Sequence, residues 1–481
     1  MSVGTMVIAA ALAISTFTSL PESHASASTG ARVWLTTDNR KSLLKEQHPI
    51  PWSNGKPRKN HFTIPVNDAK RFQQVEGFGA SLTDSSAWLI ANKLTATQRD
   101  TLMKDLFDPT TGLGISLLRQ PMGASDFSTI GNYSYDDIPA GQSDPNLTHF
   151  SIDHDRAAII PQLQAALRLN PNLKIIGTPW SPPGWMKTSD SMIGGSLKPD
   201  TYQALAQYFV RYVQAYAAES LPIYAVTPQN EPQYSPPGYP GMLMTVAEQS
   251  AFVKNYLGPA FSAAGLSTKI LIYDHNWGDQ TNGPAVYPQS LLSDPAAANY
   301  ASGVAFHCYS GDPSIMSSVH KAFPNKDMYQ TECSGGAWQG DFASSLRSQL
   351  LGYILSGMRN WSKSAILWNL ALDQNDGPTN GGCSNCRGIV TVNQSSGSVT
   401  RTADYYALGH FSRFVRPGAY RVDSKSFGRG SVNDVAFQNP DGSNVLVAYN
   451  DDVSPHVITV LSNGRNFRYK LLSGAAATFT W

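Results

Sequence analysis

The sequence predicts an α/β fold in which a (β/α)8 TIM barrel carries an attached antiparallel β-sandwich domain. Three observations predict it. Short β-type runs alternate with longer segments of helical period as far as residue 410, there are eight such runs, and short strands alone follow them. Eight βα units in about 335 residues fit a barrel with insertions better than a doubly wound sheet.

The expected barrel strands are short runs rich in apolar and β-branched residues. They span residues 75–80, 115–121, 174–179, 224–229, 269–274, 303–307, 327–331 and 365–369. Between them, apolar residues recur at helical spacing, as in 200–219 and 341–361. We therefore assign the barrel to residues 75–410.

The expected sandwich consists of short strands separated by turn signals. Its strands span residues 432–437, 445–449, 456–460, 467–472 and 476–481. The segment 28–74 has no helical period, so we expect it to contribute strands to the same sandwich. The sandwich itself is assigned to residues 411–481.

The N-terminus has the features of a secretory signal peptide. The apolar run 6–20 is short for a membrane span and is followed by Ala25-Ser26-Ala27, a small-residue cleavage site. We expect residues 1–27 to be removed and the protein to be secreted. The alternative is an uncleaved N-terminal helix.

Charge excludes several kinds of partner. Lys and Arg number 36 and Asp and Glu 35, a formal net charge of +1. Binding nucleic acid or an anionic membrane surface needs a clustered basic excess, so neither is expected.

No second segment is long and apolar enough to span a membrane. We expect a monomer that binds its substrate through shape and polar contacts.

The chain has four cysteines, too few for a disulfide scaffold. Cys383 and Cys386 form a C-x-x-C in an exported chain, which favours a short-loop disulfide, because zinc would need a second ligand pair nearby. A free or redox-active pair is the alternative. Cys308 and Cys333 each follow a strand-like run and are interpreted as small buried residues.

Reactive side chains follow the ends of the expected strands. In a barrel, these positions meet at the face where active sites are built. Acids, aromatic residues and hydrogen-bonding groups dominate the set, which comprises Asp84, Arg119, Asp126, Trp180, Trp185, Asn230, Glu231, Asp274, His275, His307, Tyr309, Glu332, Trp368 and Asn369.

Two glutamates indicate the chemistry. Glu231 and Glu332 each end a β run, in strands that lie on opposite sides of the barrel. Glycoside hydrolysis needs two carboxyl groups flanking one bond. A single Glu after a strand more often serves a helix N-terminus, but two of them, with Asn230 and tryptophans that can stack on sugar rings, favour a glycosidase.

Other catalytic motifs are missing from the sequence. It contains no H-E-x-x-H, no G-x-S-x-G and no phosphate-binding G-x-x-x-x-G-K-[ST]. Gly77-Phe-Gly79 matches only part of a dinucleotide fingerprint, because Leu82 occupies the third glycine position. We expect no metal and no cofactor.

Several motifs together resemble glycoside hydrolase family 30, which includes glucosylceramidases and microbial endo-β-1,6-glucanases. They are GFGASLTD (77–84), LRQPMGASDFS (118–128), PWSPPGWMKT (179–188), VTPQNEP (226–232), FHCY (306–309), WNLALD (368–373), FVRPG (414–418) and NPDGS (439–443). The run ECSGG (332–336) and the insertion GGCSNCRG (381–388) depart from the sequence of the family's lysosomal glucosylceramidase.

The resemblance implies a retaining double-displacement mechanism without a metal, on a barrel with a tightly attached sandwich. It implies that Glu231 is the acid/base and Glu332 the nucleophile. The substrate-binding residues that it implies are Arg119, Asp126, Trp180, Asn230, His307, Tyr309 and Trp368. Two carboxyls in one site should push their proton affinities apart, leaving Glu231 protonated and Glu332 ionised near mildly acidic pH.

We therefore expect a secreted retaining hydrolase of β-glucosidic bonds, with endo-β-1,6-glucanase as the first choice. Glucosylceramidase or β-glucosidase activity is the nearest alternative, followed by β-1,6-galactanase or xylanase. The substrate would be a β-linked oligosaccharide, polysaccharide or glycolipid. An inactive carbohydrate-binding protein on the same barrel is the alternative from another class, and the presence of both glutamates counts against it.

Overall fold

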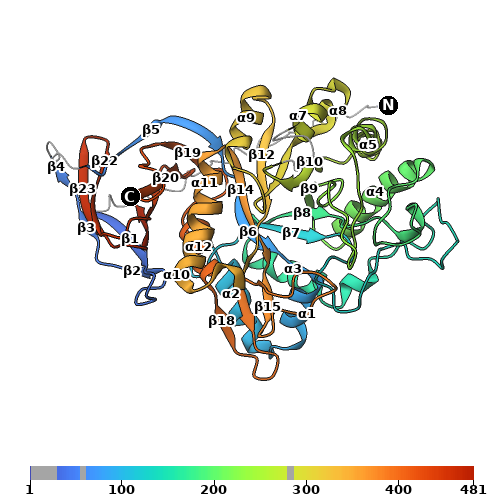
Figure 1. Ribbon diagram of the computed structural model, residues 1–481, viewed down its shortest axis with the longest axis horizontal. Helices are drawn as coiled ribbons and strands as arrows, with labels where there is room; N and C mark the ends of the chain where they lie inside the picture. Colours follow the sequence, from blue (N-terminus) through green and yellow to red (C-terminus); the bar gives the residue numbers. More distant parts are fainter. Residues whose placement is uncertain (2–29, 55–60, 279–285) are drawn as a thin grey trace.

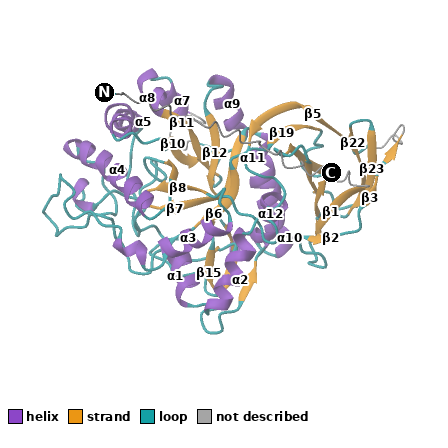
Figure 2. Cartoon of the chain, turned by 180° about the vertical axis from the view of Figure 1, so that it is seen from behind, coloured by secondary structure: helices purple, strands orange, loops and turns teal. Residues whose placement is uncertain are grey.

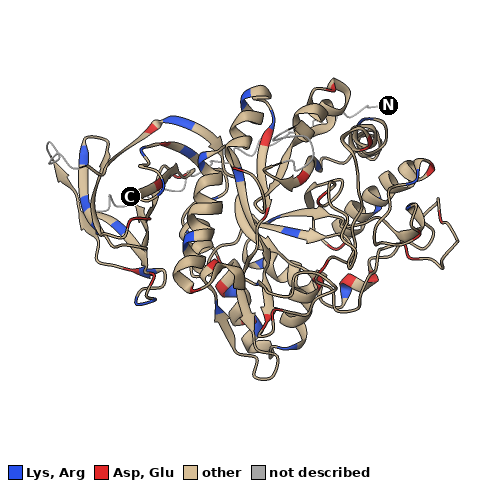
Figure 3. Cartoon of the chain, viewed as in Figure 1, with Lys and Arg blue, Asp and Glu red and all other residues tan. Residues whose placement is uncertain are grey.

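The computed structural model describes residue 1 and residues 30–54, 61–278 and 286–481. It contains a barrel ringed by helices and a second, all-β part beside it (Figure 1). Apart from Met1, the expected signal peptide lies outside the described residues. Lys, Arg, Asp and Glu are dispersed over both parts (Figure 3), in keeping with the net charge of +1.

Eight parallel strands close into a barrel, which confirms the predicted fold class. Around the barrel the order is β10 (Lys269–Asn276), β11 (Ala301–His307), β12 (Asp327–Glu332), β14 (Ser362–Asn369), β6 (Gly77–Ser81), β7 (Leu117–Pro121), β8 (Lys174–Thr178) and β9 (Ile223–Val226). The interior is packed with side chains from successive strands, namely Leu117, Ile176, Ala225, Leu271, Ala305, Tyr329 and Ile366. The barrel is thus a filled core, as this fold requires.

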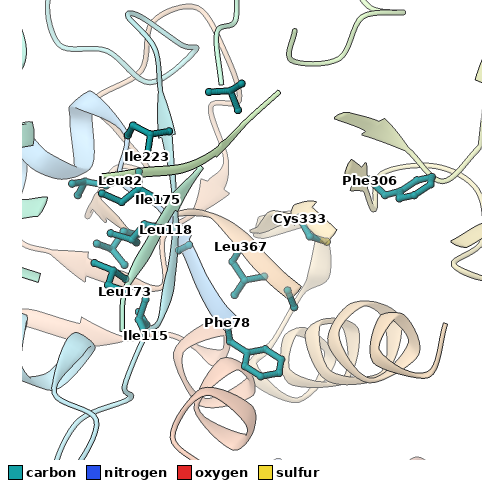
Figure 4. Packing of buried hydrophobic residues seen from close by; sticks show 14 of the residues in the cluster. Phe78, Leu82, Ile115, Leu118, Leu173, Ile175, Ile223, Phe306, Cys333 and Leu367 are labelled. Carbon is teal, nitrogen blue, oxygen red and sulfur yellow. The ribbon is translucent and has the colours of Figure 1, made fainter. Parts of the chain in front are cut away.

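Helices surround the barrel (Figure 2). They are α1 (Asp84–Asn92), α2 (Ala96–Phe107), α3 (Ile159–Leu169), α4 (Tyr202–Ala218), α5 (Val246–Phe252), α6 (Gly258–Ala263), α7 (Val286–Leu292), α8 (Pro295–Tyr300), α9 (Ser314–Ala322), α10 (Phe342–Arg347), α11 (Ser356–Arg359) and α12 (Ala403–Ser412). Their apolar faces pack on outward-facing strand residues such as Phe78 and Leu118 (Figure 4). The predicted helical segment 341–361 contains a π-helical stretch, Ser348–Leu355, between α10 and α11.

The second part is a β-sheet built from both ends of the described chain. Its order is β2 (Lys45–Glu46), β1 (Gly30–Thr36), β24 (Ala476–Thr480), β21 (Asn444–Asn450), β20 (Val432–Gln438), β19 (Tyr420–Ser424), β5 (Thr63–Gln74), β22 (His456–Ser462), β23 (Arg465–Leu471) and β4 (Ser53–Asn54), with β3 (Ile50–Pro51) paired to β1. Most pairings are antiparallel, but β5 runs parallel to β22. Sequence patterning predicted neither β19 nor the length of β5.

Alternation along β21 ties this sheet to the barrel. Val445, Val447 and Tyr449 belong to the same buried cluster as the barrel's helices, whereas Leu446 and Ala448 belong to the separate core within the β-sheet part. Successive side chains of a strand point to opposite faces, so one strand contributes to both cores.

The helix α12 occupies the junction between the two parts. It ends at Ser412, two residues beyond the boundary that the sequence predicted. His410 on this helix is fully buried, and each of its ring nitrogens lies 2.8 Å from a threonine hydroxyl, one on Thr36 and one on Thr478. These two threonines come from β1 and β24, so the first and last long strands both meet the barrel's final helix.

Two small sheets and two disulfides lie beyond the barrel strands. They are β15 (Ala371–Asp373) with β17 (Val390–Val392) and β18 (Val399–Arg401), and β13 (Gly335–Gly336) with β16 (Cys386–Arg387). Cys383 and Cys386 form a disulfide. Cys308 and Cys333 form another, so their interpretation as merely buried residues was wrong. They follow neighbouring strands, β11 and β12, which brings their Cα atoms to 5.3 Å.

Candidate active site

A cavity of about 300 Å³ opens at the carboxyl ends of the barrel strands. Its lining combines two glutamates, an aspartate, an amide and aromatic rings: Asp126, Trp180, Asn230, Glu231, Tyr239, Tyr309, Glu332, Ser334, Trp338, Trp368, Cys383 and Cys386. Both glutamates singled out from the sequence therefore meet in one cavity.

Glu332 is the last residue of β12, and its carboxylate is held from two sides. The Tyr309 hydroxyl donates to Oε1 over 2.8 Å, and Nη1 of Arg119 donates to Oε2 over 2.5 Å. Arg119 is fully buried in β7. A charge-assisted bond to one oxygen and a phenol bonded to the other fix the orientation of the Glu332 carboxyl group, as the attack of a nucleophile requires.

Glu231 lies in the turn after β9. Its backbone has a φ of +45°, and its N–H donates to the carbonyl oxygen of Asp274 over 3.0 Å. A positive φ costs energy for a residue with a Cβ, so surrounding contacts must hold the backbone in this conformation. The carboxylate Oε1 lies 3.1 Å from Nδ1 of His307 and 3.9 Å from Nε2 of His275.

The two carboxyl groups are close to each other. One oxygen of Glu231, one of Glu332 and a ring nitrogen of His307 all lie within 4.8 Å of one another. Retaining glycosidases separate their two carboxyl groups by about 5–5.5 Å, whereas inverting enzymes need about 6.5–9.5 Å to admit a water. The spacing therefore matches the retaining geometry.

Asp274 connects the residues beneath the cavity. It is fully buried on β10 and accepts hydrogen bonds from Arg119 (2.9 Å), Thr227 (2.7 Å) and Thr331 (2.6 Å), with His307 at 3.1 Å. Burial alone would raise the pKa of Asp274, but the positive charges of Arg119 and His307 and these hydrogen bonds hold it far below its usual range. Asp274 is therefore ionised and acts only as an acceptor.

His307 and Glu231 shift each other's pKa. Burial lowers the pKa of His307, but the charges of Glu332 and Asp274 outweigh it and raise that pKa to about 9. Burial would raise the pKa of Glu231, but the hydrogen bond and charge of His307 leave it lowered. The expectation of a raised Glu231 pKa in the free protein was therefore wrong, because the sequence could not show that an imidazole contacts this carboxylate.

Asp126 is an uncompensated acid in the cavity wall. Burial and the charge of Glu332 raise its pKa well above the usual range, which favours the protonated form. No group among the described residues forms a hydrogen bond with its Oδ1 atom. A buried polar atom without a partner costs free energy, so Asp126 is suited to bind a ligand hydroxyl.

Indole rings form one wall of the cavity. Trp180 and Trp368 stack with ring centroids 4.8 Å apart, and the guanidinium of Arg119 lies 4.7 Å from the centroid of Trp180. Oδ1 of Asn230 accepts from Arg119 over 2.7 Å, which orients the side-chain amide so that its N–H groups can donate to a ligand. An apolar face beside an oriented donor suits a sugar ring.

The structure does not bring every predicted residue to the cavity surface. Arg119 and His307 are fully buried and act on the glutamates from below instead of lining the cavity. Trp185 is buried and donates to Asp136 over 2.9 Å, so packing explains it. Asp84 bonds His154 and Thr129 away from the cavity. By contrast, Asp126, Trp180, Asn230, Tyr309 and Trp368 all line it, as expected.

Tyr239 and Trp338 line the cavity, and sequence reasoning missed both. Tyr239 lies in an irregular loop after β9, and Trp338 lies in a single 3-10 turn, Ala337–Gln339, after β13. Neither segment is long enough for a periodicity that would mark a side chain as inward-facing. Trp338 retains 54% of its exposure and stands at the rim. Its place six residues after Glu332 is the signal that could have found it.

A metal ion does not fit the donor set. Glu231, His307 and Glu332 are the described residues whose ligand atoms come close enough to hold one. However, Glu332 is already paired with Arg119 at 2.5 Å, and the raised pKa of His307 favours an imidazolium there. Two positive groups in contact with the carboxylates would repel a cation.

Comparisons with known proteins agree with this geometry. The model of the glycosyl hydrolase family 30 TIM-barrel domain matches residues 75–415, and that of the family's β-sandwich domain matches 418–479. Within the described residues, no helix combines the length and apolar character that crossing a bilayer requires.

Individual relatives point the same way. An endo-1,6-β-D-glucanase of Trichoderma harzianum is 34% identical, covering 95% of this chain and 94% of its own. Mouse lysosomal acid glucosylceramidase is 31% identical over 87% and 83% of the two chains. A solved endo-β1,6-glucanase is 33% identical with a TM-score of 0.85, covering 94% of this chain and 99% of its own. The chain is therefore a glycoside hydrolase that belongs to glycosyl hydrolase family 30.

Proposed function

We propose that this protein is a secreted, retaining endo-β-1,6-glucanase in which Glu332 is the nucleophile and Glu231 the acid/base. The observation that carries the proposal is that two carboxyl groups meet in one cavity, with one oxygen of Glu231 within 4.8 Å of one oxygen of Glu332. It supports the double displacement, in which a covalent glycosyl-enzyme forms and water then releases the sugar.

In the first step, Glu332 attacks the anomeric carbon while Glu231 protonates the departing oxygen. Arg119 and Tyr309 hold the attacking carboxylate in place, so little orientation is lost in reaching the transition state. In the second step, Glu231 takes a proton from water, which displaces Glu332 at the same carbon. The two inversions give net retention.

The remaining residues bind the sugar. The faces of Trp180 and Trp368 would carry its apolar side, and Asn230 would donate to the 2-hydroxyl, a contact that strengthens in the transition state. Asp126, favoured in its protonated form, offers a further hydroxyl contact from the cavity wall.

The choice of β-1,6-glucan rests on the relatives and on the cavity rim. Endo-1,6-β-glucanases match nearly the whole chain at 33–34% identity. The cavity of about 300 Å³ lies at the small end of ligand pockets, which suits one buried sugar, and exposed Trp338 beside it offers a surface for a neighbouring sugar. A glycolipid would instead place a lipid chain at that rim.

Export is proposed from two independent features. Residues 1–27 have the pattern of a signal peptide, and the described cysteines are all paired in disulfides, which persist in oxidising compartments.

A product profile tests the proposed substrate. The enzyme is incubated with β-1,6-glucan, glucosylceramide, β-1,6-galactan and xylan, and the products are separated over time. We expect a ladder of β-1,6-linked oligosaccharides from the glucan as the fastest reaction, with the β-anomer released first in the NMR spectrum. Faster release of glucose from glucosylceramide would overturn the substrate, and initial release of the α-anomer would overturn retention.

A further inference from the structure

We infer that His307, oriented by Asp274, is a positioning residue that keeps one catalytic proton in the site, shared between its Nδ1 atom and the carboxyl group of Glu231. The inference rests on the proposed role of Glu231 as the acid/base and adds to it a place where the proton is held between reactions.

Asp274 fixes which ring nitrogen of His307 carries a permanent proton. Its Oδ1 atom lies 3.1 Å from Nε2 of His307 and also accepts from the Thr331 hydroxyl, while Oδ2 accepts from Arg119 and Thr227. A carboxylate that already accepts from Thr331, Arg119 and Thr227 has no proton to give, so Nε2 must be the donor. Asp274 thus sets the tautomer of His307 from beneath the cavity.

Once Nε2 carries a proton, the other nitrogen determines the state of Glu231. Nδ1 lies 3.1 Å from Oε1 of Glu231. That hydrogen bond needs one proton, which belongs either to an imidazolium beside a carboxylate or to a carboxylic acid beside a neutral imidazole. In both arrangements the pair holds the single proton that the leaving group requires.

The surroundings favour this proton and shield it. The titratable and charged groups that face His307 are Glu231, Asp274, His275, Tyr309, Glu332 and, through Asp274, Arg119. His307 itself is fully buried, so bulk water does not compete for the proton. The pKa of His307, raised to about 9, agrees with a proton retained through neutral pH.

The reaction balances around this pair. When the glycosidic bond breaks, its electron pair stays on the leaving oxygen, which takes the shared proton from the Glu231 carboxyl, while Glu332 forms its bond to the anomeric carbon. When water attacks that carbon, the bond to Glu332 breaks and the carboxylate re-forms. The proton released by water returns to the pair, which is then ready for the next turnover.

A leaving-group series separates this role from a structural one. His307→Gln can hydrogen-bond both neighbours but cannot take up the proton. On β-1,6-glucan and on aryl β-gentiobiosides with poor leaving groups, we expect kcat/KM to fall about 10²-fold, the lower range for general acid catalysis. On the 2,4-dinitrophenyl gentiobioside, which needs no acid, we expect bond cleavage near the wild-type rate.

The pH profile gives a second readout. Because the wild-type pair offers the proton two places, it releases the proton at higher pH than Glu231 alone. We therefore expect the basic limb of kcat/KM for His307→Gln to move to lower pH by about one unit or more. The matched control is His410→Gln, another fully buried histidine bonded on both nitrogens but far from the cavity, for which the basic limb should not move.

If His307→Gln lost kcat/KM equally for all leaving groups, or if its basic limb did not move, the inference would be overturned. The glycosidase assignment would stay intact. Failure of the wild-type enzyme on every gentiobioside would instead contradict the proposed function. If His307→Gln does not fold, the wild-type enzyme with ¹⁵N-labelled histidine decides the question. Nε2 of His307 should stay protonated across the active pH range, and an unprotonated Nε2 would overturn the inference.

Discussion

Glu332 has no substitute among the residues around it. Arg119 and Tyr309 can only donate to it, and Glu231 is committed to His307. We therefore predict that Glu332→Ala lowers kcat by about 10⁴-fold or more, as expected when a covalent step loses its nucleophile. Added azide should restore part of the turnover and yield the α-glycosyl azide, identified by NMR.

The control for this variant is a glutamate at the other end of the barrel. Glu76 precedes β6 and pairs with Lys174 and Lys363. Glu76→Ala should keep kcat within a few-fold of the wild type even if it unfolds at a lower temperature. Retained turnover in Glu332→Ala without azide would contradict the assignment.

At the residue scale, the sequence reveals the reacting groups but not what tunes them. Glu231 and Glu332 could be predicted because each follows a β run at the active face of the barrel. The contact between His307 and Glu231 could not be predicted, because 76 positions separate the two residues and only the closed barrel brings them to 3.1 Å. That contact is why the direction of the Glu231 pKa was predicted wrongly.

At the element scale, the disulfide Cys308–Cys333 joins the ends of β11 and β12. Cys308 lies between His307 and Tyr309, and Cys333 follows Glu332. The bridge therefore ties the segment that carries Glu332 to the segment whose side chains contact it. For Cys308→Ala/Cys333→Ala we predict a loss of about 3–4 kcal/mol in the free energy of unfolding, from the chain entropy of a separation of 25 residues. Urea unfolding measures this loss, and kcat should fall with it.

The second disulfide provides the comparison. Cys383 and Cys386 are separated by only 3 positions, so their bridge restrains the unfolded chain less. Cys383→Ala/Cys386→Ala should lose clearly less stability than the first double variant. If the short loop proved the more stabilising of the two, the chain-entropy argument would not hold for this fold.

The loop after β12 carries Trp338, whose exposed ring stands at the cavity rim. We predict that Trp338→Ala raises KM for β-1,6-gluco-oligosaccharides by up to about tenfold, since an aromatic contact contributes about 0.5–1.5 kcal/mol. The KM of an aryl glucoside, which lacks the further sugars, should change little. Trp88→Ala, on the outer helix α1, is the control, and an unchanged KM for the longer substrates would remove Trp338 from the binding surface.

Elements were predictable where the pattern was local. Most barrel strands contain a short run of apolar residues, as in Lys174–Thr178 and Ile223–Val226, because parallel strands covered on both faces favour such sequence. The strand β19 escaped prediction because Tyr420–Ser424 is only 5 residues long and pairs with β5, which is distant in the sequence. The cysteine pairing was missed for a similar reason, since it depends on which strands are neighbours.

At the scale of the whole molecule, the β-sheet part should be inseparable from the barrel. Removing residues 411–481 takes away β24, the partner of β1, and Thr478, which contacts His410. It also uncovers the barrel surface beneath Val445, Val447 and Phe437, each of which contributes about 1.5–3 kcal/mol when buried. An unpaired β1 edge beside that apolar surface favours association between chains.

We therefore predict that a chain of residues 28–410 accumulates as aggregate and shows no glucanase activity, measured by the soluble fraction and by product release. Separately produced 411–481 should not rescue it fully, because β5 must pair with both β19 and β22 while the chain folds. A soluble and fully active 28–410 chain would mean that the sheet is an accessory module. The site beneath Glu231 and Glu332 would then depend on the barrel alone.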